Sequence, residues 1–201
     1  HVAALMANLA EFATSQPVFG PLAACAVLHY QFETIHPFED GNGRLGRLLI
    51  PVYLLGHEVI DRPIIYLSSF FEAHHEEYVA RLKRVSTEGD WLGWVRFFLR
   101  AIHFQAVDSR HRVEAILNLR QHYAELVRSR SRTQASLTAL DFVMEQVYVT
   151  VSEVATYTRK EYKTARAAID TLSSLGILEP LVAGYPQRWV ARELLQHIYQ
   201  E

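Results

Sequence analysis

The spacing of apolar residues limits the fold of this chain more than any other feature of the sequence. From the first residues to about residue 123, apolar side chains recur three and four positions apart, which is the period of a helix with one buried face. Proline and glycine separate most of the segments that have this period. The segments are 2–12, 21–33, 42–56, 68–85 and 91–123. The pattern predicts that the first part of the chain folds as consecutive α-helices.

The last of these segments is long for a single helix. It is either one very long helix or two helices with a break near Asp108 and Ser109. The stretch RSRSR that follows is polar and has no apolar stripe, so we place a domain boundary there. The predicted organisation is a helical core at 1–108, a linker helix at 109–132 and a second domain at 133–201.

The second domain has a different pattern. Helices are expected at 137–147, 151–157 and 164–175, and short strands at 177–182 and 188–190 around the turn AGYPQ. Three helices and a hairpin form the outline of a winged helix-turn-helix. The predicted fold class is therefore mainly α, with an all-helical core followed by a small α+β winged helix-turn-helix domain.

Composition and charge narrow the class of protein. Half of the 201 residues are apolar and the formal net charge is −2, so the chain can bury a core and has no overall basic field. The single cysteine, Cys25, cannot form an internal disulfide, which suits the cytoplasm that we predict as its location. No apolar run has the length of a membrane span. The chain starts at His1 without methionine, so we expect it to be the later part of a longer protein or to have lost its start.

The segment HPFEDGNGRLGR at residues 36–47 combines groups that handle phosphate. Gly41 and Gly43 allow a sharp turn into the helix that begins there, and the unpaired N–H groups at a helix start bind anions. Arg44 and Arg47 follow one helical turn apart. Both guanidinium groups can therefore reach the same side and hold a polyphosphate.

Two further side chains in this segment add the groups that a transfer reaction needs. A carboxylate at Asp40 would repel phosphate unless a cation lies between them, and magnesium is normally held by one or two carboxylates together with phosphate oxygens. A neutral imidazole at His36 can accept a proton from a hydroxyl group that attacks phosphorus. We expect Phe38 to anchor the loop to the core. The residues predict a general base, a magnesium ligand, a phosphate cradle and two phosphate clamps.

These residues resemble the signature of the Fic (filamentation induced by cAMP) family, His-Pro-Phe-x-Asp-Gly-Asn-Gly-Arg-x-x-Arg, at every defined position. The flanking sequences HYQFETIHPF, RLLIPVYLL and YLSSFFEAHHEEYVARL are similar to the family as well. The resemblance is tight over roughly the first half of the chain. It is looser over the second half, although many bacterial relatives carry a C-terminal winged helix.

The resemblance implies a protein adenylyltransferase, which moves AMP from ATP to a hydroxyl side chain and releases pyrophosphate. It assigns His36 as the general base and Asp40 as the ligand of the magnesium that accompanies ATP. Asn42 and the N–H groups of the loop would cradle the phosphates, and Arg47 would meet the γ-phosphate. The nucleotide- and phosphate-binding residues are thus Gly41, Asn42, Gly43, Arg44 and Arg47.

The resemblance also separates branches of the family. A phosphotransferring branch has lysine where Gly43 stands, so the glycine argues against phosphate transfer. Other relatives are inhibited by a helix with a Ser/Thr-x-x-x-Glu-Gly/Asn motif, which we do not find in these residues. If the inhibitory helix is N-terminal, we expect it upstream of His1. Relatives often have Asn-Arg or Asn-Lys where this chain has His74 and His75, which leaves contacts to the base or ribose open.

Other interpretations stay open. The chain could be a winged-helix DNA-binding regulator whose Fic half senses a nucleotide, or the same site could remove AMP from a modified protein. Cations in the second domain could form a DNA-reading face or a solvated surface: Arg159, Lys160, Lys163, Arg166 and Arg188. The expected partners are ATP, a protein with a Ser, Thr or Tyr hydroxyl (including the chain itself), DNA through the C-terminal domain and a second copy in a homodimer. No membrane is expected.

Overall fold

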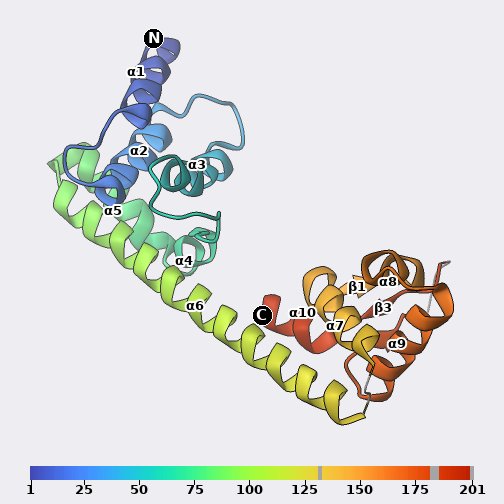
Figure 1. Cartoon of the computed structure of the whole chain (residues 1–201). Helices are drawn as coiled ribbons and strands as arrows, with labels where there is room; N and C mark the ends of the chain where they lie inside the picture. The colour runs from blue at the N-terminus through green and yellow to red at the C-terminus, as the bar shows by residue number, and fades with distance from the viewer. Residues whose placement is uncertain (131–132, 182–185, 200–201) are drawn as a thin grey trace. The chain divides into compact units, whose positions relative to one another are not determined.

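The computed structural model describes residues 1–130, 133–181 and 186–199. It divides into two compact units, residues 1–110 and 111–201, and each is described by itself. The helices that begin in the first unit are α1 (Val2–Thr14), α2 (Pro21–Ile35), α3 (Asn42–Gly56), α4 (Ser68–Ala73), α5 (His75–Glu88) and α6 (Trp91–Arg130). Figure 1 labels these elements along the chain.

The long segment after residue 91 is a single helix. Helix α6 runs through Asp108 and Ser109, so the interpretation with two helices is wrong. Its first half belongs to the first unit and its second half to the second unit. The linker helix that we expected at 109–132 lies within α6 as far as Arg130, and residues 131–132 are outside the described part.

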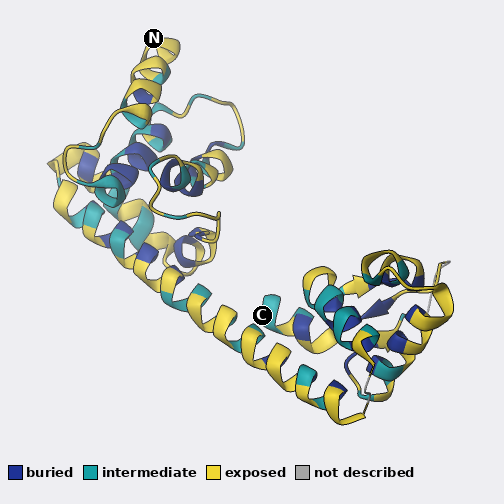
Figure 2. Ribbon diagram, viewed as in Figure 1, coloured by how far each residue is buried: buried dark blue, intermediate teal, exposed yellow. Residues whose placement is uncertain are grey.

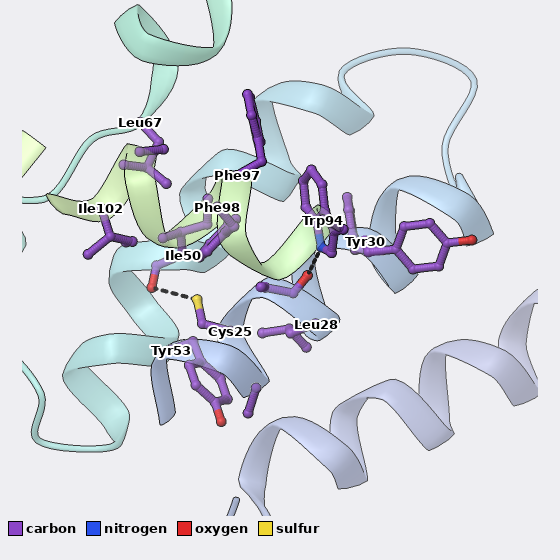
Figure 3. Packing of buried hydrophobic residues seen from close by; sticks show 14 of the residues in the cluster. Cys25, Leu28, Tyr30, Ile50, Tyr53, Leu67, Trp94, Phe97, Phe98 and Ile102 are labelled. Carbon is purple, nitrogen blue, oxygen red and sulfur yellow. Dashed lines mark hydrogen bonds between the residues drawn. The ribbon is translucent and has the colours of Figure 1, made fainter. Parts of the chain in front are cut away.

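The core of the first unit forms where α6 packs against α2 and α3. Trp94 and Phe98 of α6 are fully buried, as are the small residues 24–26 of α2. The small side chains of α2 leave room for these large rings, and the Trp94 Nε1–H donates to the Ala26 carbonyl at 2.8 Å (Figure 3). Cys25 lies in this core with its thiol 3.9 Å from the Ile50 carbonyl, and burial raises the pKa of that thiol. It is therefore a packing residue and not a nucleophile.

The predicted helix at 68–85 is two helices. His74 separates α4 from α5 with φ −119° and ψ 33°. Its ring stacks on Phe70 with centroids 4.1 Å apart, and its Nδ1 lies 2.9 Å from the Phe70 carbonyl, so the side chain stabilises the break. Leu67 occupies the cap position of α4, and Ser68 is its first helical residue.

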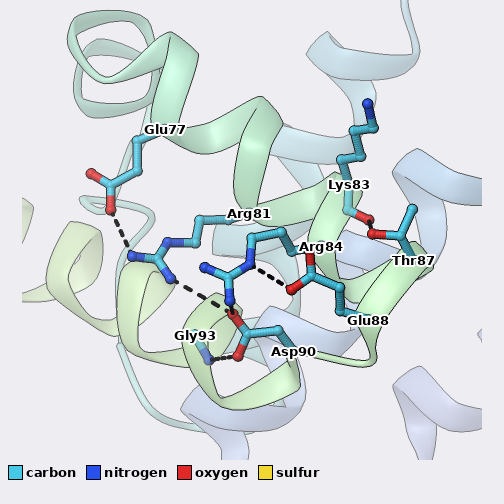
Figure 4. A network of polar contacts seen from close by, with 8 residues as sticks. All are labelled: Glu77, Arg81, Lys83, Arg84, Thr87, Glu88, Asp90 and Gly93. Atoms are coloured by element: carbon cyan, nitrogen blue, oxygen red, sulfur yellow. Dashed lines mark hydrogen bonds and ion pairs between the residues drawn. The ribbon is translucent and has the colours of Figure 1, made fainter.

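Asp90 starts α6. Gly89 ends α5 in the left-handed conformation (φ 71°), and the Asp90 Oδ1 then accepts the Gly93 N–H at 2.9 Å. The other carboxylate oxygen lies 3.1 Å from Arg84 and 3.8 Å from Arg81 (Figure 4). One side chain therefore caps α6 and ties its start to α5.

The second unit combines helices with a small sheet. Its elements after α6 are α7 (Gln134–Gln146), β1 (Tyr148–Val149), α8 (Val151–Thr158), α9 (Tyr162–Ser174), β2 (Glu179–Pro180), β3 (Trp189–Val190) and α10 (Arg192–Ile198). The strands form an antiparallel sheet in the order β1-β3-β2, with Val190 opposite both Tyr148 and Glu179. In Figure 2, α9 turns its buried side toward the unit and its exposed side toward solvent.

The strands are shorter than the sequence predicts. The expected strand at 177–182 is reduced to β2, which lies at the sheet edge and contains Pro180, a residue with no N–H to donate. Val182 and residues 183–185 of the expected turn lie outside the described part. The sequence prediction missed β1 and α10, since two strand residues and seven helical residues give little periodic signal.

Candidate active site

His36 lies at the end of α2. Its backbone is in the left-handed conformation (φ 49°, ψ 60°), and its N–H donates to the Phe32 carbonyl at 3.0 Å. Its Nδ1 is 3.3 Å from the Glu33 carbonyl oxygen, and because a carbonyl only accepts, Nδ1 must be the donor of this bond. The exposed imidazole then keeps an unprotonated Nε2 that can accept a proton.

The loop after His36 is held by Asn42. The Phe38 N–H donates to the Asn42 Oδ1 at 3.0 Å, and the Asn42 Nδ2 donates to the Phe38 carbonyl at 2.6 Å. Asn42 is 2% exposed, whereas Phe38 is 50% exposed. The expectation that the Phe38 ring anchors the loop is therefore wrong, because the loop is fixed through the main chain of Phe38. The Asn42 side chain is engaged in the loop, which leaves its backbone N–H for the cradle.

The start of α3 presents backbone donors. Gly41 is the residue before the helix and has φ 82°, a value that favours glycine. The N–H groups of the first three helical residues, 42–44, precede the first helical hydrogen bond, which joins the Leu45 N–H to the Gly41 carbonyl at 3.0 Å. These donors and the helix dipole favour an anion at this end of α3.

The two arginines lie back over the two glycines. A Cβ on Gly41 would be 3.3 Å from the Nη2 of Arg44, and a Cβ on Gly43 would be 3.2 Å from the Nη1 of Arg47. Helical side chains point toward the N-terminus, so both guanidinium groups come close to the free N–H groups. The structure brings the predicted cradle and both clamps together, and the glycines leave space for the clamps.

Asp40 faces solvent beside this cradle. Its Oδ1 accepts the Gly41 N–H at 2.6 Å, and its Oδ2 is 3.2 Å from Arg44 in an ion pair whose side chains are 94% and 76% exposed. Such an exposed pair contributes little stability, so both partners are available to a ligand. Among the described residues no three carboxylate, imidazole or thiol groups form a metal cluster. One carboxylate next to a phosphate cradle fits magnesium that brings phosphate oxygens with it.

A cavity of about 320 Å³ opens next to Arg47. Polar side chains from α4 and α5 line much of it; the full set is Arg47, Ser68, Phe71, Glu72, His75 and Tyr78. Of the two adjacent histidines, His75 faces the cavity and His74 is stacked on Phe70.

The sequence prediction missed His29 and Tyr78. His29 is fully buried, and its Nδ1 lies 3.0 Å from the Gly46 carbonyl, to which it must donate. Burial lowers the pKa of His29 to about 4, so its Nε2 is unprotonated and accepts the Tyr78 hydroxyl at 3.0 Å. The Tyr78 proton is thus directed away from the cavity that Tyr78 lines, and burial raises the pKa of this hydroxyl.

The sequence prediction also missed Glu33. Its Oε1 is buried and has no hydrogen-bond partner in the described part of the chain. A Cβ on Gly46 would lie within van der Waals overlap of this oxygen, at 2.1 Å. Burial raises the pKa of Glu33, and the charges of Arg47 and His36 oppose that shift. The spacing of residues in the sequence does not predict the contact between Glu33 and Gly46, because α2 and α3 meet only in the folded chain.

Residues 1–54 match the Fic/DOC family. The relatives with curated names are similar over part of the chain. A protein adenylyltransferase Fic from Aedes aegypti is 38% identical over 82 residues, which is 40% of this chain and 15% of that protein. One from Culex quinquefasciatus is 38% identical over 79 residues, covering 38% and 14%. The protein adenylyltransferase fic-1 of Caenorhabditis elegans is 28% identical over 93 residues, covering 45% and 16%. The match thus spans about a seventh of these relatives.

A solved structure has a similar fold. The crystal structure of a Fic family protein from Desulfovibrio desulfuricans G20 is 21% identical with a TM-score of 0.51, and the match covers 94% of this chain and 55% of that one. The candidate site at residues 36–47 lies inside the segment that matches the family. The fold of this chain is mainly helical and Fic-like, with a small three-stranded antiparallel sheet near the C-terminus.

Proposed function

We propose that this chain is a protein adenylyltransferase, which transfers AMP from ATP to a Ser, Thr or Tyr hydroxyl of a target protein. The observation that carries the proposal is the position of the His36 Nε2, free and exposed, beside a helix start with two guanidinium groups. The names of the relatives from Aedes aegypti and Culex quinquefasciatus agree with this reaction.

The reaction follows from the roles of these residues. The target hydroxyl oxygen attacks the α-phosphorus, its proton passes to His36 Nε2, and the bond from the α-phosphorus to the bridging oxygen breaks. The N–H groups at the start of α3 and the side chains of Arg44 and Arg47 hold the phosphates and stabilise the negative charge on the pyrophosphate that leaves. Magnesium at Asp40, when bound, would neutralise further phosphate charge. The Glu33 carbonyl accepts from Nδ1–H, so Nε2 is the nitrogen that takes up the proton.

The test follows two labels in parallel. The chain is incubated with Mg²⁺ and either α-labelled or γ-labelled ATP, alone and with a cell lysate, and label is counted above that of the lysate without the chain. We expect label on protein from α-labelled ATP only, and its loss in His36→Ala by at least about 100-fold because the general base is removed. The matched control is His111→Ala, since His111 is an exposed histidine of α6 outside the site.

Each other outcome assigns a different activity. Label from γ-labelled ATP would show phosphate transfer, and equal labelling of wild type and His36→Ala would exclude His36 as the base. ATP binding without labelling would favour a nucleotide-sensing regulator. Loss of label from a previously modified protein would show removal of AMP by the same site.

We also propose that residues 133–201 form a winged helix-turn-helix domain. Support comes from the order of elements, α7-β1-α8-α9-β2-β3, with β3 between the other two strands. Helices α8 and α9 are separated by residues 159–161, and Arg159 takes a left-handed conformation (φ 53°) that turns the chain. A short turn between two packed helices is the helix-turn-helix arrangement.

A further inference from the structure

Helix α9 has one face in the core and one face in solvent. Its buried residues recur at helical spacing and pack with α7 and α8; they are Ala165, Ala168, Ile169 and Leu172. The opposite face is exposed and carries Lys163, Arg166 and Ala167. Because α7, α8 and the sheet are already on the buried side, this exposed face is available to a partner.

Cations without acidic partners gather at the start of this face. Arg159, Lys160 and Lys163 are exposed, and no ion pair joins any of them to an acid in the described residues. Two other arginines of the unit are neutralised, since Arg120 pairs with Asp141 at 2.6 Å and Arg192 with Glu179 at 2.8 Å. The α8–α9 turn and the first turn of α9 thus carry three exposed cations, with one exposed acid, Glu161, among them. Arg128 and Arg130 at the end of α6 are also exposed, so the proposal below rests on the position of the three cations and not on their being the unit's sole cations.

Arg166 joins this face to the sheet. Its guanidinium lies 5.2 Å from the centre of the Trp189 ring, and its Nε donates to Asp170 at 3.0 Å. Trp189 belongs to β3 and is buried, so Arg166 is held between α9 and the sheet. Arg188, also exposed, precedes Trp189 in the chain.

We infer that this surface, made by Arg159, Lys160, Lys163 and the exposed face of α9, binds the phosphate backbone of duplex DNA; this inference rests on the winged helix-turn-helix proposed above. A single exposed helix that rises from a helix-turn-helix fits the major groove, whose width of about 12 Å admits one helix. Cations at the turn before that helix would contact the phosphates at the groove edge. The net charge of the whole chain is −2, so binding would depend on this local surface and not on overall charge.

Fluorescence anisotropy with a labelled random-sequence duplex of about 20 base pairs measures this binding in the full chain, since non-specific contacts need no particular sequence. We expect affinity to fall linearly with salt on logarithmic axes. The variant Lys160→Ala/Lys163→Ala should lower affinity about tenfold at low salt and reduce the salt slope by about two, because two phosphate contacts are lost.

The control variant is Lys83→Ala/Arg96→Ala. It removes the same charge from exposed positions of the first unit, and it should bind the duplex like the wild type. Circular dichroism establishes that both variants remain folded. His36→Ala should also bind normally, so a failure of the AMP-transfer proposal would not affect this one.

Four results would overturn the inference. They are absence of duplex binding at low salt, equal binding by wild type and the Lys160→Ala/Lys163→Ala variant, an equal loss in the control variant, and tighter binding to single-stranded RNA than to the duplex.

Discussion

Single atoms decide the shape of the candidate site, and the glycines show this most clearly. Gly41 and Gly43 leave space for Arg44 and Arg47, while Gly46 leaves space for a buried carboxylate from α2. The sequence predicts the first two glycines as turn residues, and their contact with the arginines follows from the direction of helical side chains. Nothing in the sequence predicts the third contact, since it joins two helices.

Gly46→Ala should destabilise the first unit by about 1–3 kcal/mol, because its Cβ would meet the Glu33 Oε1 at 2.1 Å and the Phe32 ring at 3.1 Å. Glu33→Ala in the same chain should restore more than half of that loss. Urea unfolding measures both. Gly56→Ala is the matched control: nothing lies within 4 Å of its Cβ, so stability should be unchanged or higher by up to about 1 kcal/mol. A Gly46→Ala chain as stable as the wild type would contradict the contact.

Acid should destabilise the first unit through His29. Burial lowers its pKa from 6.5 to about 4, so the unfolded chain takes up a proton at a higher pH than the folded chain. Stability from this group is full above pH 6.5 and falls as the pH decreases toward 4, by up to about 3 kcal/mol. His29→Phe should flatten the dependence of unfolding free energy on pH in this window. His111→Phe, at an exposed position, should leave it as in the wild type. Equal slopes in all three chains would show that His29 does not titrate in this way.

At the scale of elements, helix starts and breaks depend on side chains that bond the backbone. The period of apolar residues predicts α1, α2 and α3 correctly, because each buries one continuous face. It could not predict the break at His74, since the apolar stripe continues across it and the stacking on Phe70 is set by packing. The sequence could not predict β1 either, because its two residues are too few to show an alternation of apolar and polar side chains.

Asp90 should contribute in two separable ways to the start of α6. Asp90→Ala removes the cap and both arginine contacts, and it should cost about 1–2 kcal/mol in urea unfolding. Asp90→Asn keeps an oxygen for the Gly93 N–H and loses only the charge, so it should cost less than half as much. Glu88→Gln removes the charge from an exposed ion pair in which the Glu88 carboxylate lies 3.0 Å from Arg84. This change should alter the free energy of unfolding by less than about 0.5 kcal/mol. If Asp90→Asn were as costly as Asp90→Ala, the ion pairs and not the cap would be the main contribution.

On the scale of the whole molecule, the described residues form two hydrophobic cores that share no residue. One contains buried residues between Leu9 and Ile102, and the other contains buried residues between Leu119 and Leu194. The sequence predicts two parts from the change of pattern near residue 130. It predicts boundaries at residues 108 and 132, and the two units of the structure divide after Arg110, inside α6. The sequence could not decide whether the helix is continuous there, because the apolar period alone fits both one long helix and two. No described helix is long and apolar enough to cross a membrane.

Two cores should give two unfolding transitions. Leu54→Ala and Leu140→Ala remove matched side chains, which are 0% and 1% exposed, from the first and second core. Each should lower the stability of its own unit by about 2–5 kcal/mol and leave the other transition in place. Calorimetry, or hydrogen exchange followed by mass spectrometry, measures the units separately. A single transition that shifts equally in both variants would show that the cores unfold together.

The amide of Asn42 has a consequence for the thermodynamics of nucleotide capture. Its two bonds to Phe38 close residues 38–42 into a small ring before any ligand arrives. Ordering a backbone residue costs on the order of 1–2 kcal/mol, so a loop that became ordered only on binding would weaken the binding free energy by several kcal/mol. In this chain the loop is already ordered by folding. A nucleotide would meet a preorganised cradle, and the entropy lost on capture would be mainly its own.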